Sequence, residues 1–164
     1  MIFFGIFLTF SSANAGNIND LRIFQAGSNT TRVVLGSDSG VPYRAFVLNN
    51  PLRVVIDFPL LEWQAPMNKG DRSGRIKSYR QSVFQKDTRR VVFDLSVPMI
   101  IGKHSRQTSE NGHGWQYMFD LQPASAMQFQ QSIGRVLVGG GAPQSAAGGG
   151  GAGGVGDGAE STGA

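Results

Sequence analysis

Two stretches of the chain share the same alternation of apolar and polar positions. Residues 52–58 read Leu-Arg-Val-Val-Ile-Asp-Phe, and 63 residues later residues 115–121 read Trp-Gln-Tyr-Met-Phe-Asp-Leu. Because successive side chains of a strand point to opposite faces, Val54, Ile56 and Phe58 share one face of the first stretch. Each stretch ends in an aspartate between two apolar residues. The pattern predicts two strands in equivalent places of a duplicated β domain.

The segments before these two strands repeat as well. Residues 76–80 match residues 21–25 at an offset of 55, residues 89–93 match 31–35 at 58, and residues 97–99 match 41–43 at 56. Turn signals rich in Gly, Asn, Asp and Pro separate the apolar runs. The sequence therefore predicts an all-β fold: a sandwich of two symmetric four-stranded antiparallel sheets, built from an internal repeat with halves 21–58 and 76–121.

The alternation also predicts the core of this sandwich. One face of each strand should be buried, and the expected core residues are Val33, Leu35, Ile56, Phe58, Phe93, Leu95, Phe119 and Leu121. The third strand of each half is expected at residues 43–48 and 99–104, and a polar loop at residues 105–114. The pattern does not decide which side chains of the third strands face inward.

The two ends of the chain differ from the β domain between them. Residues 1–10 are apolar and are followed by Ser-Ser-Ala-Asn-Ala, which predicts a secretory signal peptide over residues 1–15, cleaved after Ala15, and a periplasmic location. This segment lacks a basic n-region, and the alternative is a buried first strand. The domain is expected over residues 16–122, with a short helical or extended edge element at 123–138. Residues 139–164 are Gly-rich and are expected to form a disordered linker.

The composition of the chain excludes some kinds of site and favours one class of partner. The chain has no cysteine, which excludes disulfides and thiolate metal sites. Its formal net charge of +4 suits an anionic partner, although a charge of this size is also common for solubility alone. No second apolar run is long enough to span a bilayer, so no integral membrane segment is expected in the mature chain.

Candidate catalytic groups are few. His104, Glu110 and His113 offer nitrogen and oxygen ligands for zinc, but their spacings of six and three match no helical pair, and solvated loop residues are the favoured interpretation. Asp57 and Asp120 are equivalent in the repeat, yet as polar-face residues they are expected to form ion pairs with Arg53 or Arg90. We therefore expect no catalytic residue and no metal ligand in this chain.

A basic stretch with interleaved aromatic residues is the better candidate for a binding site. Basic residues can bind phosphates or carboxylates, and aromatic rings can stack on bases or sugar rings. A solvated strand face is the alternative interpretation. The expected ligand-binding residues are Arg72, Arg75, Lys77, Tyr79, Arg80, Lys86, Arg89 and Arg90.

Residues 21–121 resemble the AMIN domain, the non-catalytic N-terminal module of AmiC-like periplasmic N-acetylmuramoyl-L-alanine amidases, which also occurs in secretins. The resemblance rests on residues 31–35, on the Asn-Asn-Pro-Leu-Arg-Val-Val-Ile-Asp-Phe phrase at residues 49–58, and on residues 76–81, 88–95 and 119–121. It implies a module that binds peptidoglycan and directs its enzyme to the division septum.

The same resemblance sets expectations for partners and cofactors. The partner is expected to be peptidoglycan rather than nucleic acid, with divisome or secretin proteins as further partners. The family also implies a zinc amidase domain after the linker. The chain ends at Ala164 within that linker, so we expect no hydrolysis and no cofactor from this chain, with zinc only in the amidase domain that is missing from it. The alternative function is a protein-docking module of the cell envelope, as in secretins.

Overall fold

The computed structural model describes residues 16–59, 61–66 and 75–140. The predicted signal peptide and residues 141–164 of the predicted linker lie outside these ranges. No helix among the described residues has the length and apolarity needed to cross a membrane. The elements in chain order are β1 (Asn17–Gln25), β2 (Thr31–Ser37), β3 (Tyr43–Leu48), β4 (Arg53–Pro59), β5 (Glu62–Trp63), β6 (Ile76–Gln85), β7 (Thr88–Leu95), β8 (Met99–Thr108), β9 (Trp115–Pro123), α1 (Ala126–Ser132) and β10 (Leu137–Gly139).

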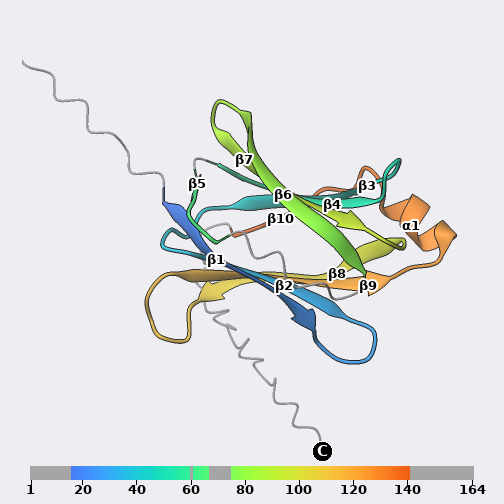
Figure 1. Cartoon of the computed structure of the whole chain (residues 1–164), viewed down its shortest axis with the longest axis horizontal. Helices are drawn as coiled ribbons and strands as arrows, with labels where there is room; N and C mark the ends of the chain where they lie inside the picture. Colours follow the sequence, from blue (N-terminus) through green and yellow to red (C-terminus); the bar gives the residue numbers. More distant parts are fainter. Residues whose placement is uncertain (1–15, 60, 67–74, 141–164) are drawn as a thin grey trace, which may run out of the picture.

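The strands form two sheets that pack face to face (Figure 1). Sheet A has the order β5-β1-β2-β9-β8, and sheet B has the order β10-β3-β4-β7-β6. The predicted all-β sandwich is therefore confirmed. Each sheet has five strands rather than four, because β5 adds a short parallel strand beside β1 and β10 adds a short antiparallel strand beside β3.

The two halves of the repeat are divided between the sheets. Sheet A joins β1 and β2 of the first half to β9 and β8 of the second, and sheet B joins β6 and β7 of the second half to β4 and β3 of the first. Exchanging the halves therefore gives the same strand order. Ile18 lies opposite Ser37 and Ile76 opposite Leu95, and an irregularity follows each isoleucine. The first strands thus repeat at an offset of 58 rather than the predicted 55. The two alignments differ by three residues, and a difference by an odd number exchanges the two faces of a strand.

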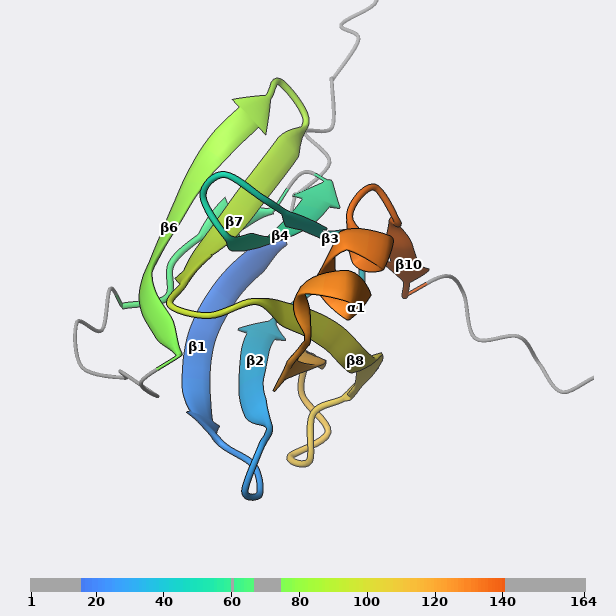
Figure 2. The same cartoon turned by 90° about the vertical axis from the view of Figure 1, so that its right-hand side faces the viewer.

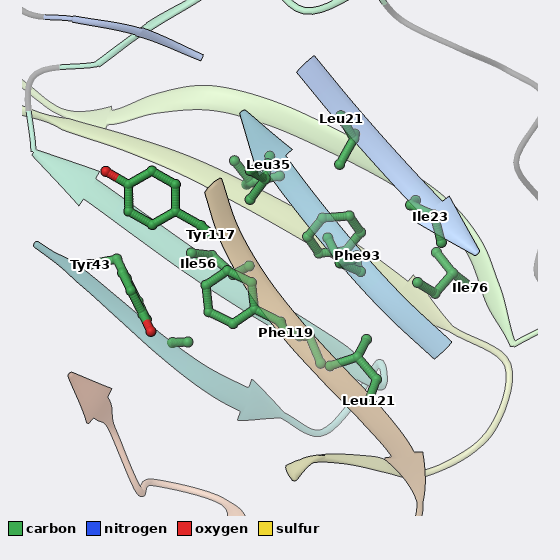
Figure 3. Packing of buried hydrophobic residues seen from close by; sticks show 14 of the residues in the cluster. Leu21, Ile23, Leu35, Tyr43, Ile56, Ile76, Phe93, Tyr117, Phe119 and Leu121 are labelled. Atoms are coloured by element: carbon green, nitrogen blue, oxygen red, sulfur yellow. The ribbon is translucent and has the colours of Figure 1, made fainter. Parts of the chain in front are cut away.

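The core lies between the sheets (Figure 3), and all eight predicted core residues belong to it and are buried. The third strands of the two halves, β3 and β8, contribute unequally to this core. Tyr43, Ala45 and Val47 of β3 are buried, and Tyr43 packs edge-on against Phe119 with 5.0 Å between ring centroids. β8 contributes Met99 to the core and Ile101 packs against it, while residues 103–108 of this strand are polar. β8 therefore contributes fewer buried side chains to the core than β3 does.

β8 extends further than the sequence pattern indicates. Residues 105–108 were expected in a polar loop, but they continue the ladder with β9 as far as the pair Thr108–Trp115. The guanidinium carbon of Arg106 lies 4.5 Å from the centroid of the Trp115 ring, a cation–π contact across the two strands. Cross-strand packing thus keeps this polar segment in the sheet.

The segment after β9 covers one side of the sandwich. The side chain of Ser125 accepts a hydrogen bond from the Gln128 backbone amide and caps α1, and Phe129 is the buried residue of the helix. β10 then pairs with β3. Figure 2 shows α1 and β10 next to β3 and β8. The ambiguous periodicity of residues 124–138 is explained, since the segment contains both a helix and a strand.

Candidate functional site

The sheet separates the residues of the predicted basic stretch. Arg72 lies outside the described residues. Arg75 directly precedes β6, Lys77 lies at its start, and Lys86 lies in the turn between β6 and β7. Because side chains alternate along these paired strands, Arg80 and Arg90 face outward from sheet B, whereas Tyr79 and Arg89 face the other sheet. The predicted residues therefore do not form one surface.

Arg89 has a structural role at the edge of the sandwich. Its Nε donates a hydrogen bond to the Leu61 carbonyl oxygen at 2.9 Å, Nη1 donates to Gln81 at 2.7 Å, and Nη2 donates to Glu62 at 3.0 Å. Since Glu62 belongs to sheet A and Arg89 to sheet B, these bonds connect the two sheets. Tyr79 packs beside Phe93 at 6.1 Å between ring centroids. Neither Arg89 nor Tyr79 is placed to contact a ligand on the outer face.

Arg90 occupies the centre of the outward side of sheet B. Its Nε and Nη2 donate hydrogen bonds to the Asp57 carboxylate at 2.7 and 2.8 Å. The guanidinium carbon of Arg90 also lies 3.4 Å from the centroid of the Phe84 ring and 5.6 Å from that of Phe46. The ion pair thus holds Arg90 in place, and Arg90 in turn supports the half-exposed Phe84 ring.

A second cluster lies on the same side, around Asp94. Its carboxylate accepts hydrogen bonds from Arg80 and from the Ser78 hydroxyl. Arg53 lies nearby, with its Nε 3.9 Å from the carboxylate. We call the whole surface the outer face of sheet B, and its residues are Arg44, Phe46, Arg53, Asp57, Arg80, Phe84, Arg90 and Asp94.

A groove of about 450 Å³ crosses one end of this face. Phe46 and Phe84 line it together with Pro42 and Pro59, and Arg44, which is exposed, also lines it. Arg44 lies opposite Asp57 in the ladder but forms no ion pair with any described residue. The groove therefore combines aromatic rings with a guanidinium that is available to an acidic ligand.

The ligand-binding residues predicted from the sequence did not include Arg44, Phe46 and Arg53. The alternation along residues 43–48 does place Arg44 and Phe46 on one side of a strand. The missing information was the pairing of β4 with β7, a contact between the two halves that brings this side next to Arg90.

The outward side of sheet A repeats the central ion pair. Nε and Nη2 of Arg32 donate hydrogen bonds to the Asp120 carboxylate at 2.6 and 2.9 Å. The prediction that Asp57 pairs with Arg90 is confirmed, whereas Asp120 pairs with Arg32 instead of the predicted Arg53 or Arg90. Both aspartates are thus held by arginine in the centre of a sheet, an arrangement that suits a scaffold rather than acid–base chemistry.

The Asp120 pair makes the fold sensitive to acid. The hydrogen bond from Arg32 lowers the pKa of Asp120, against the opposing effect of burial. This stabilisation is present above the pKa of an unfolded aspartate, about 3.9, and is lost as the pH falls through the lower pKa of the folded state. We expect the free energy of unfolding, measured in urea, to fall more steeply below about pH 4 in the wild type than in Asp120→Asn. Equal slopes for the two proteins would contradict this assignment.

The candidate zinc residues are not brought together. His104 lies within β8, where its Nδ1 is 2.8 Å from the Tyr43 hydroxyl. Glu110 and His113 are exposed and lie beyond the end of β8, in the turn that leads to β9. Among the described residues, no group of three or more His, Asp or Glu side chains is positioned to hold a metal ion.

Comparison with known proteins identifies the fold. Residues 20–117 match the AMIN domain. A comparison with curated proteins finds no match. The matched region covers more than half of the chain and extends from β1 into β9. It includes the whole Arg90–Asp57 ion pair, and it includes Arg32 but not Asp120 of the other central pair. The chain therefore belongs to the AMIN domain family.

Proposed function

We propose that this chain is a non-catalytic module that binds peptidoglycan through the outer face of sheet B. The observation that carries the proposal is the groove that Phe46 and Phe84 line together with Arg44, which forms no ion pair with any described residue. Aromatic rings can pack against the apolar faces of sugars, and a guanidinium can bind the carboxylates of the stem peptides. AMIN domains are typical of periplasmic or exported proteins and bind components of the cell envelope, which is consistent with this ligand.

Within the family, we propose that the module directs a cell-wall N-acetylmuramoyl-L-alanine amidase to the division septum. On this proposal the module has no catalytic group and needs no cofactor, and the zinc chemistry belongs to the amidase domain. Export to the periplasm by cleavage after Ala15 is part of the same proposal. It places the module in the compartment that contains peptidoglycan.

A matched pair of double variants tests the binding face. We expect Arg44→Gln combined with Phe84→Ala to weaken pelleting of residues 16–164 with purified sacculi at low salt by about tenfold or more, since a charge-assisted hydrogen bond and a ring contact are both lost. The control is Arg22→Gln combined with Phe24→Ala, which removes the same residue types from exposed positions on the outward side of sheet A.

The control variant should pellet like the wild type. Equal loss of pelleting in the two double variants would show that the outer face of sheet B is not the contact surface. If the wild-type chain stays in the supernatant, peptidoglycan binding itself is wrong.

A second candidate function is docking to another envelope protein. β6 is a ten-residue strand at the edge of sheet B, and an edge strand offers backbone groups for pairing with a strand from a partner. In that case, crosslinking in cells would recover a protein partner while isolated sacculi would fail to bind.

A further inference from the structure

A second pocket lies between α1 and the edges of the two sheets, and it shares Phe46 with the groove on the outer face of sheet B. We call it the helix pocket. Its volume is about 370 Å³, within the usual range for small-ligand sites. Its walls include Val47 of β3, Ile101 of β8 and Leu137 of β10, and its polar groups include His104, Gln131 and Arg135. Part of the pocket is built by residues 126–137, which follow the region that matches the AMIN domain.

The charge of the helix pocket favours an anion. None of the described residues that line it is acidic. Arg135 is exposed and forms no ion pair with any described residue, so its guanidinium is available. A guanidinium binds a carboxylate with two parallel hydrogen bonds, and it keeps its positive charge at any physiological pH.

His104 supplies a second donor. Burial raises the pKa of Tyr43 to about 12, so the hydroxyl keeps its proton at neutral pH and can donate it to Nδ1 of His104. In the tautomer with the ring proton on Nε2, Nδ1 accepts this hydrogen bond from the Tyr43 hydroxyl. In that tautomer Nε2 is the ring nitrogen that can donate to a ligand, and Gln131 lines the same pocket with its side-chain amide.

The apolar walls of the helix pocket indicate which chemical groups a ligand can carry next to its anionic group. Val47, Ile101 and Leu137 provide an apolar surface next to the polar groups, and Phe46 and Ile100 also contribute to this surface. The ligand should therefore carry an apolar side chain adjacent to its charge. We propose that the helix pocket binds the free C-terminal carboxylate of a short peptide that ends in alanine. This inference rests on the proposed function, because stem peptides of peptidoglycan are a source of such termini in the periplasm.

The probe for this inference is N-acetyl-D-alanyl-D-alanine, titrated into ¹⁵N-labelled protein covering residues 16–164. We expect saturable shifts of the backbone amide signals of His104, Gln131 and Arg135. The C-terminal amide of the same peptide should bind about tenfold or more weakly, because it lacks the negative charge. Arg135→Gln should weaken binding of the acid by a similar factor, while Arg22→Gln, an exposed arginine on β1, should leave it unchanged.

Several outcomes would overturn the inference. These are the absence of saturable shifts, equal affinity for the acid and its amide, and free D-alanine binding as tightly as the dipeptide, which would point to an amino acid rather than a peptide terminus. The sacculus assay separates this inference from the proposed function. If wild-type protein pellets but the dipeptide does not bind, only the helix pocket is wrongly assigned. If the dipeptide binds but the protein does not pellet, the peptidoglycan proposal fails.

Discussion

Replacing Phe119 by alanine is expected to lower the free energy of unfolding by about 3–5 kcal/mol, the usual cost of removing a fully buried phenylalanine ring. Phe119 has no exposed surface and lies between the sheets beside Tyr117, Ile56 and Leu121 (Figure 3). Its ring also packs edge-on against Tyr43. Urea unfolding followed by tryptophan fluorescence gives this free energy directly, from the midpoint and slope of the transition.

The matched control is Phe24→Ala in the same sheet. Phe24 is 40% exposed on β1, so the same substitution leaves no cavity and should change the free energy of unfolding by no more than about 0.5 kcal/mol. The chain has no cysteine, so no disulfide holds the folded state when the core is weakened. Similar losses for the two variants would mean that Phe119 does not occupy the centre of the core.

The alternation of residues was sufficient to predict the fold class and the inward faces of four strands. It was insufficient for the outward side of β4. Asp57 was predicted on a polar face, which the alternation assigns to Val55 as well, yet Val55 and Asp57 are 1% and 8% exposed. The ladder explains the burial of Val55, because its neighbours are Phe46 on β3 and Val92 on β7. Burial of this kind depends on neighbouring strands, so the sequence of β4 alone cannot reveal it.

The same reason explains why the candidate site was predicted only in part. The basic stretch from Arg75 to Arg90 drew attention to β6 and β7, but neighbours in the sequence point to opposite faces of a sheet. Arg89 joins the two sheets, whereas Arg90 faces outward. The groove needs residues from β3 as well, and these belong to the other half of the repeat. Only the pairing of β4 with β7 brings the two sets together.

The central ion pair provides a test that separates the scaffold from the binding surface. We expect Asp57→Ala to lower the free energy of unfolding by about 2–4 kcal/mol, because Arg90 would lose both hydrogen bonds while its charge stays mostly covered. The Asp57 and Arg90 side chains are 10% and 20% exposed, so the larger losses of stability known for fully buried ion pairs do not apply. The control is Asp20→Ala, which breaks an exposed pair with Arg22 and should cost about 1 kcal/mol or less.

Removing both partners should recover much of that loss. In Asp57→Ala combined with Arg90→Met no uncompensated charge remains, and a methionine can still pack against Phe84. Urea unfolding of the two single variants and the double variant gives the coupling energy of the pair. A double variant no more stable than Asp57→Ala would contradict the uncompensated charge as the cause.

If the pair only positions the outer face of sheet B, the double variant should still pellet with sacculi to within about twofold of the wild type, because Arg44 and Phe84 remain in place. A loss of about tenfold in a double variant that is stably folded would instead make the ion pair itself part of the ligand contact.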